Sequence, residues 1–192
     1  MYAIERGVHV MVTKPAVMTV AAHRALIDAA RKNNVLVLVE YHKRYDPIYA
    51  DARQRVRETM GDFQYFVSHM TQPKFQLDVF KSWAGKSSDI SYYLNSHHID
   101  IHCWAMEGKA KPVRVCASSA SGVAESRGIP AEDLITLMVE WENIGSGNRG
   151  VAVYTSGWAA PDHGEVHSHQ RFACICAGGE VRADQAHRGC DA

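Results

Sequence analysis

The sequence predicts an α/β segment followed by an α+β domain, and two patterns of apolar residues carry this prediction. Residues 1–45 read as a strand–helix–strand unit whose second strand, Val35–Val39, is apolar without a break. Unbroken apolar strands are typical of parallel sheets covered on both faces. Residues 46–192 contain short strands joined mainly by turns, which favours a mainly antiparallel sheet with helices. The first segment is only a fraction of a doubly wound sheet.

Local signals define the elements of the first segment. Gly7–Val12 reads as a short buried strand that stops before Pro15, because proline cannot donate to a strand ladder. Thr19 is suited to cap a helix that runs to about Asn33, since its side-chain oxygen can accept an early backbone N–H. Val35–Val39 follows as the second strand.

The second segment begins with a helix and continues mainly as strands. Asp46 can cap a helix that runs to about Met60, and Pro47 suits its first turn. One further helical interval covers about Ile90–Met106. The expected strands are Phe63–Met70, Val113–Ala120, Asp133–Glu142, Val151–Thr155, Val166–Ala177 and the chain from Val181 onward.

Composition weighs against several classes of partner. The chain has 21 basic and 21 acidic residues, so it has no overall attraction to nucleic acid or to an anionic membrane. Its apolar runs are far shorter than the roughly 20 residues of a membrane-spanning helix. The five cysteines are dispersed and odd in number, which favours reduced thiols and a cytoplasmic location. We expect neither a nucleic-acid nor a membrane partner.

The stretch Gly145–Gly150 matches the GxGxxG pattern of dinucleotide-binding turns. That pattern binds a pyrophosphate only where a strand precedes it and a helix follows it. Here strand-forming residues follow, from Val151 to Thr155. We therefore predict a hairpin loop in which glycine supplies positive φ angles.

Three segments contain residues suited to chemistry. They are Ala3–Pro15, Tyr41–Pro47, and Asn95–Asp100 followed by Trp104. Their order and spacing resemble the Gfo/Idh/MocA family of oxidoreductases, which includes glucose–fructose oxidoreductase and inositol dehydrogenase. In that family a Glu-Lys-Pro strand end, an Arg-aromatic-x-Pro stretch and a His-x-x-Asp helix follow one another. No single motif is decisive, but three in the correct order are more specific than one.

The resemblance implies both an architecture and a reaction. Residues 1–45 would be the last βαβ unit of a Rossmann domain, and residues 46–192 a substrate and oligomerisation domain. The activity would be hydride transfer between NAD or NADP and a secondary alcohol of a sugar, inositol or related polyol. A homodimer or homotetramer would form through the C-terminal sheet.

The resemblance also assigns roles to four residues. Lys14 would lie beside the substrate carbon and the nicotinamide and orient the substrate hydroxyl, with Pro15 next to it. His97 would be the general acid/base, which suits imidazole because it titrates near neutral pH. Arg44 would lie where cofactor and substrate meet and would contact both.

Two positions depart from the family pattern. Thr13 stands where the family has the glutamate of Glu-Lys-Pro, and Tyr93 stands where an acid often precedes the catalytic histidine by four residues. The Tyr93 hydroxyl can still exchange a proton or hydrogen-bond the substrate. We assign Asp100 to the substrate site, mainly as a support of the helix. Trp158, expected in a loop, is our candidate for stacking on a sugar.

The chain is also short for this family, since no glycine-rich turn precedes Tyr2. We expect an internal piece of a longer protein, a truncated product or a degenerate copy, with weak or no cofactor binding on its own. A non-catalytic binding or regulatory module is the alternative. A metal-dependent hydrolase using His98 and His102, spaced i, i+4, is a more distant one. We favour packing for these histidines, because the same face offers no clear third ligand, and assign no metal.

Overall fold

The computed structural model describes residues 1–160 and 168–187. The chain divides into two compact units, Met1–His42 and Lys43–Ala192. The division falls close to the change of pattern at residue 45 in the sequence. Each unit has its own sheet.

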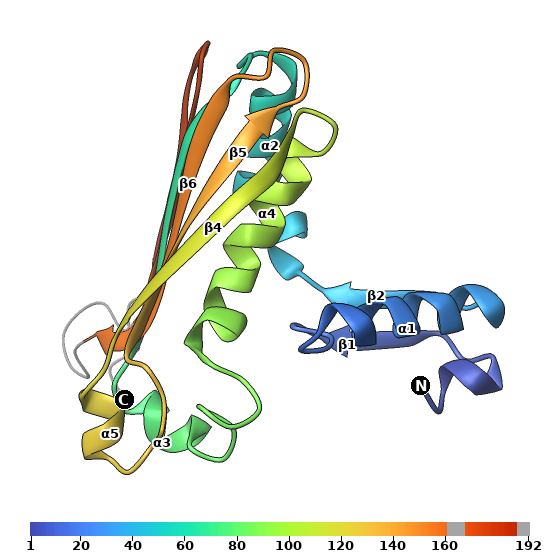
Figure 1. The fold of residues 1–192 in the computed structure, drawn as a ribbon, viewed down its shortest axis with the longest axis vertical. Helices are drawn as coiled ribbons and strands as arrows, with labels where there is room; N and C mark the ends of the chain where they lie inside the picture. The colour runs from blue at the N-terminus through green and yellow to red at the C-terminus, as the bar shows by residue number, and fades with distance from the viewer. Residues whose placement is uncertain (161–167, 188–192) are drawn as a thin grey trace. The chain divides into compact units, whose positions relative to one another are not determined.

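The first unit is the predicted strand–helix–strand arrangement (Figure 1). A short 3-10 helix, η1 (Ile4–Arg6), precedes β1 (Val10–Thr13), α1 (Val20–Lys32) and β2 (Val37–Glu40). The two strands pair in parallel. The Thr19 hydroxyl accepts the Ala22 N–H at 3.1 Å and caps α1, as expected from the sequence.

Much of the apolar surface of the first unit remains exposed. Alternate residues of both strands are half-buried, whereas those between them face solvent. Met11 is 68% exposed and Leu36 is 73% exposed. Ile4 and Val35 are the buried residues of this unit. The prediction of a strand covered on both faces therefore does not hold for β2 within these residues.

The second unit contains a six-stranded sheet with the order β4-β5-β6-β3-β7-β8. The strands are β3 (Phe63–Pro73), β4 (Ala110–Ala120), β5 (Leu134–Asn143), β6 (Arg149–Ala160), β7 (Ser168–Cys176) and β8 (Gly179–His187). All neighbours pair antiparallel except β3 and β6, which are parallel. The predicted mainly antiparallel sheet is confirmed, but this central parallel pair was not foreseen.

Two long helices, α2 (Pro47–Glu58) and α4 (Ser96–Met106), lie against one face of this sheet (Figure 1). The Asp46 carboxylate accepts the Ile48 N–H at 3.0 Å and caps α2, as predicted. The main core lies between helices and sheet, and its largest members include Tyr49, Phe63, Phe66, Met106, Trp141, Tyr154 and Phe172.

A second core lies around three short helical segments that sequence patterns did not separate. These are α3 (Gln76–Phe80), the π-helical η3 (Ser91–Asn95) and α5 (Val123–Ser126). A further short helix, η2 (His42–Tyr45), precedes α2. Trp158 belongs to this second core. It lies within β6, so the expectation of a loop at this residue is wrong. The strand continues through Gly157 because that residue packs directly on the backbone of Asp133.

The GxGxxG stretch is part of a β-hairpin, as predicted. It joins the antiparallel strands β5 and β6, and Gly147 has a φ of 75°. The Ser146 hydroxyl and the Asn148 amide donate to the Asp62 carboxylate at 2.5 and 2.9 Å. The loop is therefore held by neighbouring side chains, and a strand follows it in place of the helix that a pyrophosphate site requires.

No helix within the described residues combines the length and the apolar character needed to cross a bilayer. The sequence is also histidine-rich at residues 162–169, a stretch that fits either the neighbourhood of the site or a strand edge. Its residues 162–167 lie outside the described part of the chain.

Candidate functional site

The segment expected to hold the general acid/base is helix α4. His97 lies in its first turn, is 5% exposed and is preceded directly by the π-helical segment η3. A π-helical turn shifts the register of the residues before His97 relative to those after it. His97 and Asp100 are three residues apart on α4, so they are neighbours about one helical turn apart.

The two other histidines of α4 are core residues. His98 Nε2 lies 3.3 Å from the Tyr49 hydroxyl, and His102 Nδ1 lies 2.6 Å from the Tyr154 hydroxyl. The His102 ring stacks on Phe66 at 4.2 Å. Burial lowers the pKa of each imidazole to about 3, with the nearby Lys43 adding to the shift at His98. Both rings are therefore neutral at physiological pH.

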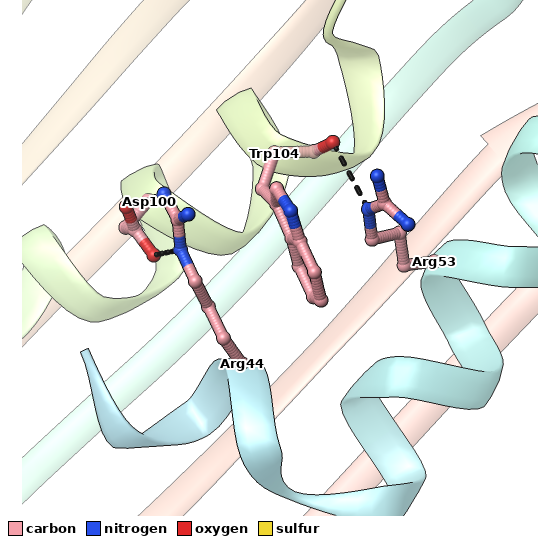
Figure 2. Close-up of polar contacts among 4 residues, drawn as sticks. All are labelled: Arg44, Arg53, Asp100 and Trp104. Carbon is pink, nitrogen blue, oxygen red and sulfur yellow. Dashed lines mark hydrogen bonds and ion pairs between the residues drawn. The ribbon is translucent and has the colours of Figure 1, made fainter.

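Arg44 and Asp100 join two of the three segments singled out in the sequence. Arg44 Nε donates to Asp100 Oδ2 at 2.7 Å, and Nη2 donates to Oδ1 at 2.6 Å (Figure 2). Two parallel charge-assisted bonds fix the guanidinium plane relative to the carboxylate. Hydrogen bonding to this carboxylate raises the pKa of Arg44. The Arg-aromatic-x-Pro stretch is thus attached to the His-x-x-Asp helix.

Trp104 lies between two arginine side chains (Figure 2). The guanidinium carbon of Arg53 is 4.1 Å from the indole centroid, and that of Arg44 is 5.4 Å away. Arg53 Nε also donates to the Trp104 carbonyl at 3.3 Å. Cation–π contacts of this kind orient all three groups on one surface formed by η2, α2 and α4. Trp104 is half-buried.

Lys43 is a buried charged residue that sequence reasoning did not select. Its Nζ lies 3.3 Å from the Tyr49 hydroxyl, which in turn reaches His98. Burial lowers the pKa of Lys43 to about 8, and Asp46 partly offsets that shift. The burial of Tyr49, Ala52 and Val56 at helical spacing would have indicated the core face of α2, but nothing in the sequence marks Lys43 as its neighbour.

Tyr93, the replacement for the family's acid, lies in η3 and is half-buried. Its ring centroid is 4.9 Å from that of Phe80 and 5.6 Å from that of Trp83. Burial raises the pKa of Tyr93, so the hydroxyl is a donor rather than a base at neutral pH. Trp158, by contrast, is fully buried, and its indole N–H donates to the Glu132 carbonyl at 2.9 Å. Its stacking surface is occupied by the core, which removes the basis for a sugar contact.

Lys14 and Pro15 directly follow β1 in the first unit, and both are half-buried. That unit has one strand-to-helix connection, and it carries Lys14-Pro15 rather than glycines. This connection leads to the N-terminus of α1 but lacks the glycine turn that lets a pyrophosphate approach a helix closely. Across the described residues, no three His, Cys, Asp or Glu side chains group as metal ligands.

The fold is similar to that of dehydrogenases of known structure. It matches GenD2 from gentamicin A biosynthesis, solved with NAD, with a TM-score of 0.73 and 22% identity over 95% of this chain. It matches scyllo-inositol dehydrogenase from Lactobacillus casei, solved with NAD(H) and scyllo-inositol, with a TM-score of 0.74 and 20% identity over 94% of this chain. The chain spans 49% and 52% of those two chains, about half of each.

Among sequences, an uncharacterised oxidoreductase of Escherichia coli, YdgJ, is 30% identical over 100 residues. The match covers 51% of this chain and 29% of YdgJ. The chain matches no family model. The resemblance to Gfo/Idh/MocA oxidoreductases seen in the sequence is confirmed at the level of the fold, which is the fold of about half of an inositol dehydrogenase.

Proposed function

We propose that this chain is the substrate-side part of an NAD(P)-dependent oxidoreductase of the Gfo/Idh/MocA family. The reaction would move hydride between the nicotinamide and a secondary alcohol of a sugar, inositol or related polyol. The Arg44–Asp100 ion pair supports this most directly, because it joins two separate family motifs in space. Residues 1–45 are the last βαβ unit of a Rossmann domain in this proposal, and residues 46–192 are the substrate domain.

Each predicted site residue has a role in this proposal except Trp158, which is buried. Lys14 orients the substrate hydroxyl, and His97 exchanges its proton. Tyr93 donates a hydrogen bond to substrate, consistent with its raised pKa. Pro15 borders the cofactor, while Asp100 acts chiefly by holding Arg44 where cofactor and substrate meet. NAD(H) and scyllo-inositol bound to the Lactobacillus casei enzyme indicate the ligand classes, without deciding between NAD and NADP.

We further propose a cytoplasmic homodimer or homotetramer that forms through the open face of the large sheet. That face carries a hollow of about 460 Å³, lined in part by Tyr65, Val67, Thr155 and Ile175. These residues alternate with the buried ones that face the helices. Sedimentation velocity of the wild-type chain and of Tyr65→Lys tests this: a shift of the variant to monomer supports the interface, and a wild-type monomer contradicts it.

Cofactor binding gives the first test of the catalytic proposal. We expect the 192-residue chain to bind NAD(H) and NADP(H) weakly or not at all in a calorimetric titration, because residues 1–160 and 168–187 include no strand–glycine turn–helix unit for a pyrophosphate. Micromolar affinity would contradict that expectation. In a protein extended by a complete Rossmann domain, Lys14→Ala and His97→Ala should each abolish most turnover, with Arg55→Ala as an exposed control. Normal turnover in both would refute the assigned roles.

A non-catalytic binding or regulatory module is the second candidate, and Tyr93 favours it. The residue that replaces the acid packs against Phe80 and Trp83. The extended protein separates the two candidates: polyol binding with no turnover in the presence of either cofactor would support the module. Turnover that depends on His97 would support the enzyme.

A further inference from the structure

Two consecutive residues of η2 are connected to α4 through different partners. Arg44 donates two hydrogen bonds to the Asp100 carboxylate (Figure 2). Lys43 is 3% exposed, and its Nζ donates to the Tyr49 hydroxyl at 3.3 Å. That hydroxyl lies 3.3 Å from Nε2 of His98, which precedes Asp100 by two residues on α4. The short helix η2 is therefore attached to α4 at two points, one in the core and one nearer the surface.

Packing fixes the attachment in the core. Tyr49 is 0% exposed, and its ring is stacked on that of Phe172 with the centroids 5.1 Å apart. His98 is also 0% exposed, and its ring centroid lies 6.1 Å from that of Phe172. The Lys43 Nζ lies 4.8 Å from the centroid of the Tyr49 ring, within the range of a cation–π contact. Both the hydroxyl and the ring of Tyr49 thus hold the Lys43 side chain.

The attachment nearer the surface has less packing around it. The Arg44 side chain is 39% exposed and that of Asp100 is 11% exposed. Partly exposed ion pairs contribute little when two long side chains must first be ordered to form them. Anchoring the preceding residue lowers this entropic cost, because it restricts the backbone from which Arg44 extends. The buried attachment of Lys43 therefore favours the Arg44–Asp100 pair.

Stability alone does not account for a lysine at this position. Burial lowers the pKa of Lys43 to about 8, and the Asp46 carboxylate offsets only part of this shift. The surroundings therefore disfavour the ammonium. An apolar side chain of similar length, such as methionine, would be buried at a lower cost.

We propose that Lys43 is a positioning residue that anchors η2 on α4 and thereby holds Arg44 against Asp100. The importance of this positioning for catalysis rests on the proposed function, in which Arg44 lies where cofactor and substrate meet. The positioning itself can be measured without turnover. An extended protein that showed no turnover would therefore refute the proposed function and leave the measurement below unaffected.

The test is the rate at which the Arg44 guanidinium rotates about its Nε–Cζ bond, measured by carbon-detected NMR of the 192-residue chain at pH 7.0. Two hydrogen bonds to one carboxylate hold the guanidinium plane and slow this rotation. We expect Lys43→Met and Tyr49→Phe each to speed the rotation roughly five-fold, the factor that corresponds to one hydrogen bond. Lys43→Met should leave the melting temperature unchanged or raise it, because it removes a buried charge.

Arg53 is the internal control, since its Nε donates to the Trp104 carbonyl on the same helix α4. Lys32→Met, at an exposed lysine of α1, is the matched control and should change the rotation of neither arginine. An unchanged Arg44 rotation in both test variants would overturn the proposal. Equal acceleration of Arg44 and Arg53 would also overturn it, because it would show a general loosening of the helices. If Lys43→Met does not fold, Tyr49→Phe decides, since it keeps the stacked ring.

Discussion

The two units of this protein use the same local signals, but only the second surrounds its helices with a core. Thr19 caps α1 and Asp46 caps α2 through comparable side-chain hydrogen bonds. Yet α1 has no buried residue, whereas α2 buries Tyr49, Ala52 and Val56. A cap and a periodic sequence therefore specify a helix, whereas its burial depends on the apolar surface that other segments pack against it. The predicted residues Lys14 and Pro15 belong to the less buried unit.

The largest difference should appear when equivalent apolar side chains are removed from the two units. Phe66 is 1% exposed in the main core, so Phe66→Ala should lower the free energy of unfolding by about 3 to 5 kcal/mol. Leu38 is 48% exposed on β2, and Leu38→Ala should change the free energy of unfolding by less than about 0.5 kcal/mol. Denaturant unfolding followed by tryptophan fluorescence and by hydrogen exchange measures both. A Leu38→Ala cost similar to that of Phe66→Ala would remove the contrast.

Acid should affect the second unit next most strongly through its buried histidines. His98 and His102 have folded pKa values of about 3, below the usual unfolded value near 6.5. The unfolded state therefore binds protons first, and stability falls as pH falls from about 6.5 toward 3. Each histidine contributes up to about 1.4 kcal/mol per pH unit in that window.

Unfolding measured at pH 7.0 and pH 5.5 tests this dependence. His98→Asn or His102→Gln should reduce the loss of stability between the two pH values, whatever its effect at pH 7.0. His23→Gln, at an exposed residue of α1, is the control and should leave the pH dependence unchanged. An unaltered dependence in both core variants would contradict the assignment of neutral buried rings.

The ion pair that joins two motifs should give a smaller effect. Asp100→Asn removes the charge that holds Arg44. We expect it to lower the free energy of unfolding by about 2 kcal/mol, the usual contribution of hydrogen bonds to charged groups. Arg44→Lys should cost nearly as much, because an ammonium cannot form the two parallel bonds. The exposed i, i+4 pair Asp51–Arg55 is the control, and Asp51→Asn should cost less than about 0.5 kcal/mol. If Asp100→Asn lowered the free energy of unfolding as little as the control Asp51→Asn, the Arg44–Asp100 pair would have no structural role.

The helix caps should give the smallest effect and the finest comparison. Thr19→Ala and Asp46→Ala each remove one capping acceptor, worth about 1 kcal/mol. Because α2 packs into the main core, we expect Asp46→Ala to lower the fluorescence-detected midpoint. Thr19→Ala should instead speed amide exchange within α1 and leave that midpoint unchanged. A change of midpoint in both variants would mean that the two units unfold together.

Much of the architecture could be read from the sequence because its signals are local. Thr19 and Asp46 marked helix starts, and Gly145–Gly150 was recognised as a hairpin because strand formers follow it. The order of Lys14, Arg44 and His97 indicated a dehydrogenase-like fold, which structural neighbours confirm. The roles of these residues remain predictions.

Only the tertiary structure decided which side chains meet. The parallel pairing of β3 with β6 joins residues as far apart in sequence as Tyr65 and Val151, and no local pattern encodes such a pairing. Trp158 was expected in a loop, yet β6 continues through it, Gly157 packs closely on the Asp133 backbone, and Trp158 is buried. Composition and spacing were enough to determine the main strands and the long helices and their order. The Arg44–Asp100 pair and the burial of Lys43 depended on long-range packing, which brings together residues that are distant or unremarkable in the sequence.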